Sequence, residues 1–267
     1  APFAHFYQPW PVPLANGGGW TIAVRWAREV HALPEAFLYG FSFVVYFAHE
    51  RGAFLAGNFS STGWWWFFPF AFLVKSTMGE LIATGLIAVR SAALIRTLGT
   101  QRIRALATSP WMPLLLFSVV FLTVTLTSKL NIGQRHILPL YLVLFILTGA
   151  LFSARAPRWL RGISAAAVLL SAVESLSNHP NHLAFFNQPA GGPQNGWRLL
   201  VDSSLDWGQD VAPLGAWVER HRQPNERVFV SCFGTADPEY EGIRGEALSP
   251  CYSLGKPGIW FELEPVL

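Results

Sequence analysis

Two neighbouring basic residues near the middle of the chain are the first candidates for chemistry. Arg135 and His136 lie in the stretch 131–141, just before an apolar run. A guanidinium offers a planar fork of N–H donors that fits phosphate oxygens, so a phosphate contact is one interpretation of Arg135. Tyr141 would face the same region, one or two turns further along. The alternative is that Arg135 only extends its charged end to a membrane surface, which is common for arginine.

Lys75 is a second candidate for binding a phosphate. It lies in an otherwise apolar segment, five positions before Glu80. Charges inside a membrane-spanning segment are costly and tend to be functional. The alternatives are an anchor at the membrane surface or an ion pair with Glu80, although a spacing of five is not ideal for a pair on a helix.

A third candidate is an acidic stretch, in which Asp202, Ser204, Asp206 and Asp210 place oxygens at alternate positions. The pattern resembles a calcium loop, but Trp207 replaces the required glycine and no Glu closes a loop of about 12 residues. We therefore expect no metal here. We expect Asp206 to cap the following helix, with Asp210 near its first turn and its positive dipole end. A role of this loop in docking onto a membrane domain near an active site stays open.

The composition predicts that membrane-spanning helices hold these residues in place. The chain is 52% hydrophobic and 13% charged, with 12 Trp and 21 Phe, whereas ordinary soluble domains are about 25% charged. A membrane-spanning helix needs about 20 apolar residues. Four segments approach this, and we predict an α-helical integral membrane bundle of about four transmembrane helices within residues 63–176. The predicted spans are at about 67–95, 111–127, 136–152 and 159–176.

The first of these segments has two interpretations, because Lys75 and Glu80 interrupt it. One is a surface helix up to about residue 74, followed by a span from about 75 to 95. The other is a single span that carries two charges.

The arginines predict the orientation of the bundle. They gather in the two loops that follow the first and third spans, whereas the loop between the second and third spans has only Lys129 and the bordering Arg135. Loops rich in Lys and Arg stay in the cytoplasm. Residues 1–62 and 177–267 would then both lie on the side of the membrane away from the cytoplasm. The loop arginines are Arg90, Arg96, Arg102, Arg104, Arg155, Arg158 and Arg161.

The N-terminal part, residues 1–62, is predicted to be an extracytoplasmic loop with interfacial helices. Two short helical patterns occur near 21–31 and 35–48, and neither is long enough to span a bilayer. The density of aromatic residues suits a membrane surface.

The C-terminal part, residues 177–267, is more polar and is predicted to be a small extracytoplasmic α/β domain. A strand, a helix and a strand in that order favour a βαβ unit. The predicted strands are at 198–202, 227–232 and 259–263, and the predicted helix is at 207–221. Cys232 and Cys251 either form one disulfide in an oxidising compartment or remain buried thiols.

Three stretches carry a resemblance to a known family. Residues 131–141 read Asn-Ile-Gly-Gln-Arg-His-Ile-Leu-Pro-Leu-Tyr, and residues 183–193 read Leu-Ala-Phe-Phe-Asn-Gln-Pro-Ala-Gly-Gly-Pro. Residues 200–210 read Leu-Val-Asp-Ser-Ser-Leu-Asp-Trp-Gly-Gln-Asp, and Phe-Gly-Thr-Ala-Asp-Pro follows at 233–238. Together they resemble the C-terminal half of bacterial membrane glycosyltransferases related to protein O-mannosyltransferases, over about residues 35–245.

The resemblance implies an inverting transfer of a sugar from a polyprenyl-phosphate carrier to an extracytoplasmic protein, lipid or glycan acceptor. It favours Arg135, His136, Tyr141 and Lys75 as substrate-binding residues, with Asp206 and Asp210 on a loop near the site. The implied partners are this carrier, the acceptor and membrane lipids. We expect no cofactor and no nucleic acid.

The chain departs from the family at one place. The family's acidic catalytic pair follows its first spanning helix, but residues 1–28 contain no Asp or Glu. We therefore expect the general base to lie upstream of Ala1, and this piece alone to be inactive. The alternative is a non-catalytic membrane protein, such as a transporter half or an envelope scaffold, in which Lys75 and Glu80 mark a solute path.

Overall fold

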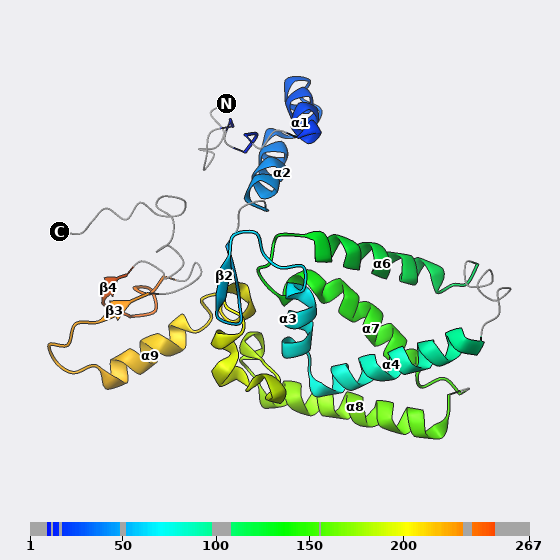
Figure 1. Cartoon of the computed structure of the whole chain (residues 1–267). Coiled ribbons are helices and arrows are strands. Elements are labelled where there is room, and N and C mark those ends of the chain that lie inside the picture. The colour runs from blue at the N-terminus through cyan, green and yellow to red at the C-terminus, as the bar shows by residue number, and fades with distance from the viewer. Residues whose placement is uncertain are drawn as a thin grey trace.

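The computed structural model is mostly helical (Figure 1). The structure describes residues 10–11, 13–15, 18–48, 52–97, 108–154, 156–231 and 237–248. Cys232, Cys251, Arg102, Arg104, Arg155 and the predicted strand at 259–263 lie outside these residues.

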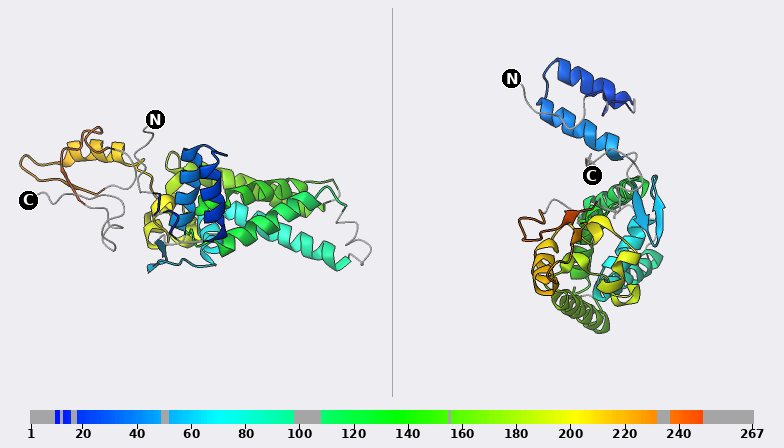
Figure 2. Two further views of the ribbon diagram at one scale, coloured as in Figure 1. Left: turned by 90° about the horizontal axis from the view of Figure 1, so that it is seen from above. Right: turned by 90° about the vertical axis from the view of Figure 1, so that its left-hand side faces the viewer.

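Four long helices form the main body of the molecule. They are α4 (Met78–Thr97), α6 (Met112–Thr127), α7 (Leu138–Ala150) and α8 (Arg158–Ser177). They run side by side along one direction in Figure 1, and Figure 2 shows the same body end-on. The segments predicted as spans at 111–127, 136–152 and 159–176 are therefore helical, with ends within two residues of the predicted ones. α4 covers the later part of the segment predicted at 67–95.

Two helices of this body are long and apolar enough to cross a membrane, as judged over the described residues. They are Met78–Arg96 and Arg158–Ser177. The apolar segments Glu35–Tyr46, Met112–Thr127 and Gln134–Ala150 are shorter.

The first predicted span is two helices rather than one. α3 (Phe67–Lys75) ends where Ser76 takes an extended conformation, with φ −80° and ψ 148°, and α4 begins at Met78. This break agrees with the interpretation in which a first helix ends near residue 74. A single continuous helix over 67–95 is wrong.

α4 and α8 pack closely because small residues face one another. A Cβ atom at Gly79 would lie 2.0 Å from the carbonyl oxygen of Ala167 and 2.3 Å from the Oγ of Ser171. Small residues at helix interfaces let backbones approach closely. At the same end, the Thr77 and Ser171 hydroxyls lie 2.8 Å apart, and the Met78 N–H donates to Glu174 over 2.7 Å.

The N-terminal part contains α1 (Gly19–Glu29) and α2 (Glu35–Ala48), which confirms the two predicted short helices. α1 buries Val24 and Ala27 against Leu38 of α2. The two helices project from one side of the main body (Figure 2).

A hairpin of β1 (Ala53–Leu55) and β2 (Asn58–Ser60) follows these helices, and the sequence did not predict it. The Ala56 N–H donates to the Leu199 carbonyl over 2.9 Å, which joins the hairpin to the C-terminal part.

The C-terminal part differs from the predicted βαβ unit. The predicted strand at 198–202 is wrong, because this segment runs through the short helical turns η4 (Pro193–Arg198) and η5 (Asp202–Ser204). Asp202 has φ +60°, a left-handed backbone that turns the chain there. The strand predicted at 227–232 is only the two-residue β3 (Phe229–Val230), which pairs in parallel with β4 (Glu246–Ala247).

The helix predicted at 207–221 is α9 (Val211–His221), which begins four residues later than predicted. Asp210 occupies its N-cap position. The prediction that Asp206 caps this helix is wrong, because the Asp206 carboxylate instead accepts from the Gly208 N–H over 2.7 Å.

Replacing Gly79 by Ala should destabilise the protein by about 1–3 kcal/mol, because the added methyl group overpacks the α4–α8 contact. Gly85→Ala is the matched control on the same helix, since a Cβ there meets no atom within 4 Å. Alanine is the better helix former, so the control should be neutral or stabilising. Thermal unfolding in detergent measures both, and equal melting temperatures for the two variants would refute this account of the packing.

Candidate functional site

The break between α3 and α4 is the place where distant parts of the chain meet. We call residues Leu73–Thr77 the α3–α4 junction. Side chains of a buried apolar cluster surround it, and they come from β1, α3, α7 and the segments before α9. The members of this cluster are Leu55, Phe67, Phe68, Ala71, Val74, Ile137, Tyr141, Phe186 and Leu200.

Lys75 ties the junction to the C-terminal part. It is only 7% exposed, and its Nζ donates to the carbonyls of Leu183 and Ser204, over 2.6 Å each. The ammonium also lies 4.3 Å from the centre of the Phe186 ring. Burial lowers the pKa of Lys75 to about 7, whereas the carbonyls and the ring favour the charged form and oppose this shift. Among the described residues, no ion pair joins Lys75 to Glu80.

Asn187 makes a second set of bonds to the junction, although the sequence analysis assigned it no role. Its side-chain amide donates to the Leu73 carbonyl over 2.6 Å and to the Ser76 carbonyl over 2.9 Å. Its backbone N–H donates to the Val74 carbonyl, and its Oδ1 accepts from the Ala190 N–H. One buried asparagine thus satisfies three carbonyls at the end of α3. The sequence feature that could have pointed to Asn187 is its place as a polar residue directly after two phenylalanines.

Tyr141 approaches the junction from α7. Its hydroxyl lies 2.6 Å from the Ser76 Oγ and accepts from the Gln134 amide. The side chain is buried. His136 packs edge-on against Phe68, with ring centres 6.2 Å apart. Tyr141 and His136 therefore both lie against α3 or the junction.

The stretch 131–133 packs on the segment at 203–204. The Ser203 hydroxyl donates to the Ile132 carbonyl, and a Cβ at Gly133 would lie 2.9 Å from the Ser203 Oγ. The Asn131 Oδ1 accepts from the Trp64 N–H. All three stretches that carry the family resemblance thus contact α3, the residues around it, or one another.

Arg135 lies on the surface of this assembly. Its guanidinium carbon is 4.9 Å from the centre of the Trp207 ring, and both side chains are exposed. Within the described residues, its N–H donors make no hydrogen bond to the protein. An exposed guanidinium that an aromatic ring orients, and whose donors are available, is suited to bind a phosphate group.

The loop that carries Trp207 is held by its own side chains. The Trp207 N–H donates to the Gln209 side chain over 2.6 Å, and the Gln209 amide donates to the Leu205 carbonyl over 3.3 Å. Asp206 holds the next turn through Gly208. Asp210 is exposed and makes no side-chain hydrogen bond at the start of α9.

The structure thus divides the predicted site residues into two groups. Lys75 and Tyr141 are buried at the junction, and His136 packs beside it. Arg135 is exposed and lies against Trp207. Trp207 directly follows Asp206 in the sequence. Trp207 itself was missed as a site residue, since its contact with Arg135 joins positions 72 residues apart.

Comparison with known proteins assigns this chain to no family. No protein-family model matches this chain, and neither a curated protein nor a solved structure does.

Replacing Lys75 by Met keeps much of the side-chain volume but removes the donors to the Leu183 and Ser204 carbonyls. A buried acceptor left without a donor costs about 1–3 kcal/mol. We therefore expect a clear fall in the melting temperature of the protein in detergent. Lys129→Met is the matched control, because Lys129 is exposed, and it should change the melting temperature little. A Lys75→Met variant as stable as the control would contradict the structural role of Lys75.

Proposed function

We propose that this chain is part of a membrane glycosyltransferase. The reaction would transfer a sugar from a polyprenyl-phosphate carrier to an extracytoplasmic acceptor, with inversion at the anomeric carbon. The observation that carries the proposal is Arg135, an exposed guanidinium with available donors, held on Trp207 where two of the family-like stretches, 131–141 and 200–210, meet.

In this proposal, Arg135 binds the carrier phosphate. The acceptor oxygen attacks the anomeric carbon, and the bond between that carbon and the phosphate oxygen breaks. The electron pair of that bond leaves on the phosphate, where a guanidinium would stabilise the added charge. A carboxylate outside the residues assigned here would take the acceptor proton. Lys75 would act indirectly, by holding the junction that supports Tyr141 and the stretch around Arg135.

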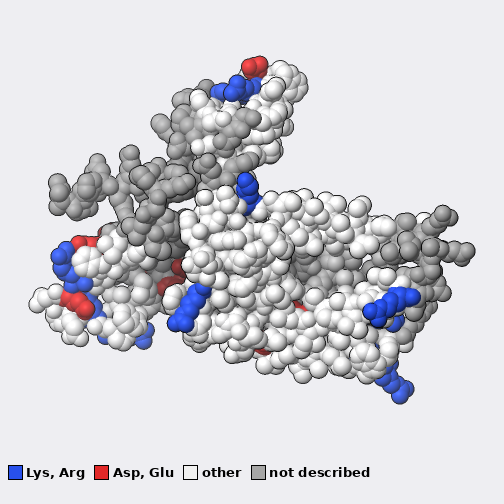
Figure 3. All heavy atoms as spheres, viewed as in Figure 1, with Lys and Arg blue, Asp and Glu red and all other residues white. Residues whose placement is uncertain are grey.

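The membrane arrangement belongs to the same proposal. α4, α6, α7 and α8 would all cross the bilayer, with the junction at the extracytoplasmic end. Two observations support this. Trp111 and Trp159 are exposed at the opposite end of the body, at the starts of α6 and α8, where an aromatic belt would lie. The face in Figure 3 is mostly uncharged along the helices, with Lys and Arg near either end.

A transporter half or an envelope scaffold remains the alternative proposal. The transporter alternative requires Lys75 and Glu80 to be charges along a solute path. Lys75 bonds two carbonyls, and Glu80 accepts from the Thr77 N–H over 2.8 Å. Lys75 is thus bonded within the protein and does not face a solute path, and for this reason we favour the glycosyltransferase.

Arg135→Ala tests the proposed phosphate contact. The full-length protein would be supplied with a radiolabelled polyprenyl-phosphate sugar, and transfer to the acceptor fraction would be measured. We expect at least a tenfold loss of transfer, which corresponds to about 1.4 kcal/mol, a modest value for a charge-assisted contact. Arg135→Lys should recover only part of it, because an ammonium lacks the planar fork.

The matched control is Arg198→Ala. Arg198 is also exposed and stacks on a tryptophan, Trp197, at 5.1 Å. Transfer should be unchanged in this variant. Equal transfer by the Arg135 and Arg198 variants would remove Arg135 from the site.

The proposed orientation has its own test. Single cysteines would be introduced at two exposed positions, Ala154 after α7 and Glu219 in α9, after Cys232 and Cys251 are changed to Ser. A membrane-impermeant maleimide added to intact cells should label Glu219→Cys, and Ala154→Cys only after the membrane is opened. Labelling of both from outside would reject the arrangement.

A further inference from the structure

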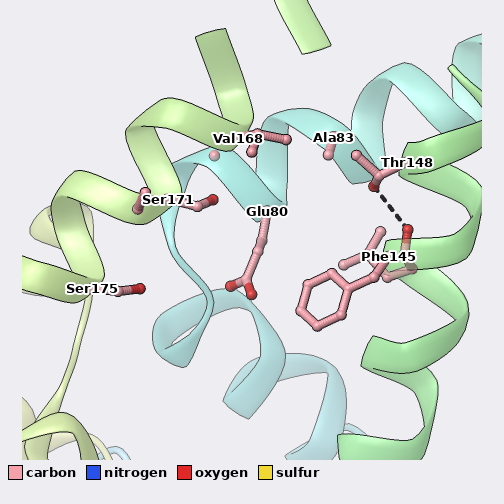
Figure 4. A pocket seen from close by; sticks show the side chains of 10 residues that line it. Glu80, Ala83, Phe145, Thr148, Val168, Ser171 and Ser175 are labelled. Atoms are coloured by element: carbon pink, nitrogen blue, oxygen red, sulfur yellow. Dashed lines mark hydrogen bonds between the residues drawn. The ribbon is translucent and has the colours of Figure 1, made fainter. Parts of the chain in front are cut away.

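A groove opens along the main helical body, and Arg135 is not among the residues that line it. α4 forms its floor with Gly79, Glu80 and Ala83, while α7 and α8 form its two walls (Figure 4). Its volume is about 260 Å³. This is near the lower limit of about 300 Å³ for small-molecule pockets, so it would hold part of a ligand such as one segment of a lipid chain.

The lining of the groove is amphipathic. Its walls are mainly apolar, with Leu144, Phe145 and Val168 among them. Glu80 is its single charged side chain, and no Lys, Arg or His lines it among the described residues. Figure 4 shows the carboxylate of Glu80 pointing into the space beside Phe145.

The carboxylate lies where the apolar segment begins. Glu80 is in the first turn of α4, and the candidate span starts at Met78. A charged group at the end of a span, with apolar walls continuing along the helices, matches the shape of a membrane lipid: the headgroup is at the surface and the chain lies below it.

Part of the negative charge at this end is left for a ligand. Glu80 Oε2 accepts from the Thr77 N–H, and its other oxygen accepts no hydrogen bond from the described residues. Glu174 adds a second carboxylate at the same helix end, on the Met78 N–H. Neither carboxylate forms an ion pair with a described Lys or Arg.

We propose that this groove binds a phospholipid whose headgroup carries a primary ammonium, as in phosphatidylethanolamine. The ammonium would lie against Glu80, and one acyl chain would lie between α7 and α8. A lipid whose headgroup bears only negative charge, a polyprenyl phosphate included, would be repelled by the carboxylate. The groove would therefore be a lipid site distinct from the carrier site proposed at Arg135. It rests on the proposed membrane arrangement of α4, α7 and α8, but not on the proposed sugar transfer.

Binding of two lipids that differ only in headgroup tests this. The full chain in detergent micelles would be titrated with phosphatidylethanolamine or phosphatidylglycerol of the same acyl chains, and bound lipid would be counted by native mass spectrometry. We expect phosphatidylethanolamine to bind at least fivefold more tightly. Glu80→Gln should abolish this preference. Gln also suits this position of a capping box, so the helix end should remain intact.

A second variant tests the groove itself. Ala172→Leu adds bulk to an exposed wall residue of α8, and it should weaken the binding of both lipids. Ala92→Leu, also exposed but on α4 away from the groove, is the matched control and should change nothing.

Three results would overturn the proposal. Equal affinity of the wild-type chain for the two lipids would remove the recognition of an ammonium group. An unchanged preference in Glu80→Gln would remove Glu80. Unchanged binding in Ala172→Leu would place the lipid elsewhere. Equal melting temperatures of the variants and the wild-type chain would show that any loss of binding is not a loss of fold.

Discussion

The break between α3 and α4 leaves backbone groups inside the molecule that no helix can satisfy, and buried polar groups need partners. Asn187 supplies donors to the carbonyls of Leu73, Val74 and Ser76. Glu174 accepts from the Met78 N–H at the start of α4. The partners come from α8 and from the segment after it, so this one interruption fixes how the C-terminal part lies against the helices.

Lys75 also joins the junction to the C-terminal part, but in this case the donor lies in the junction. Here the side chain belongs to the junction, and the carbonyls belong to residues 183 and 204. Burying an ammonium is costly unless it is well bonded, so Lys75 holds these segments at a defined distance from α3. The position of Ser203 against Ile132 then follows, and so does the position of Trp207 under Arg135. The exposed cation is thus oriented by bonds made in the interior.

The start of α4 needs negative charge to cap the helix, and the same charge faces a groove that could bind a ligand. The first N–H groups of a helix favour negative charge, and Glu80 and Glu174 provide it. Gly79 lets α8 approach one side of α4 closely, whereas α7 and α8 leave space over the floor residues Glu80 and Ala83. The same carboxylate therefore caps a helix and faces an apolar groove, and this pairing of charge and apolar wall is the basis for the proposed lipid site.

The helices could be predicted from the sequence alone, because runs of apolar residues and short polar breaks need no distant partner to be recognised. The sequence also showed Arg135 and Lys75 to be positively charged residues next to or within apolar segments. Three features depend on contacts between segments far apart in the chain. Lys75 is buried on two carbonyls, Asn187 satisfies the end of α3, and residues 198–204 turn instead of forming a strand. The local pattern there is apolar and strand-like, but bonds from Lys75 and Ala56 to its carbonyls outweigh that preference. Contacts such as Arg135 with Trp207 join residues far apart in the chain, so no local pattern encodes them.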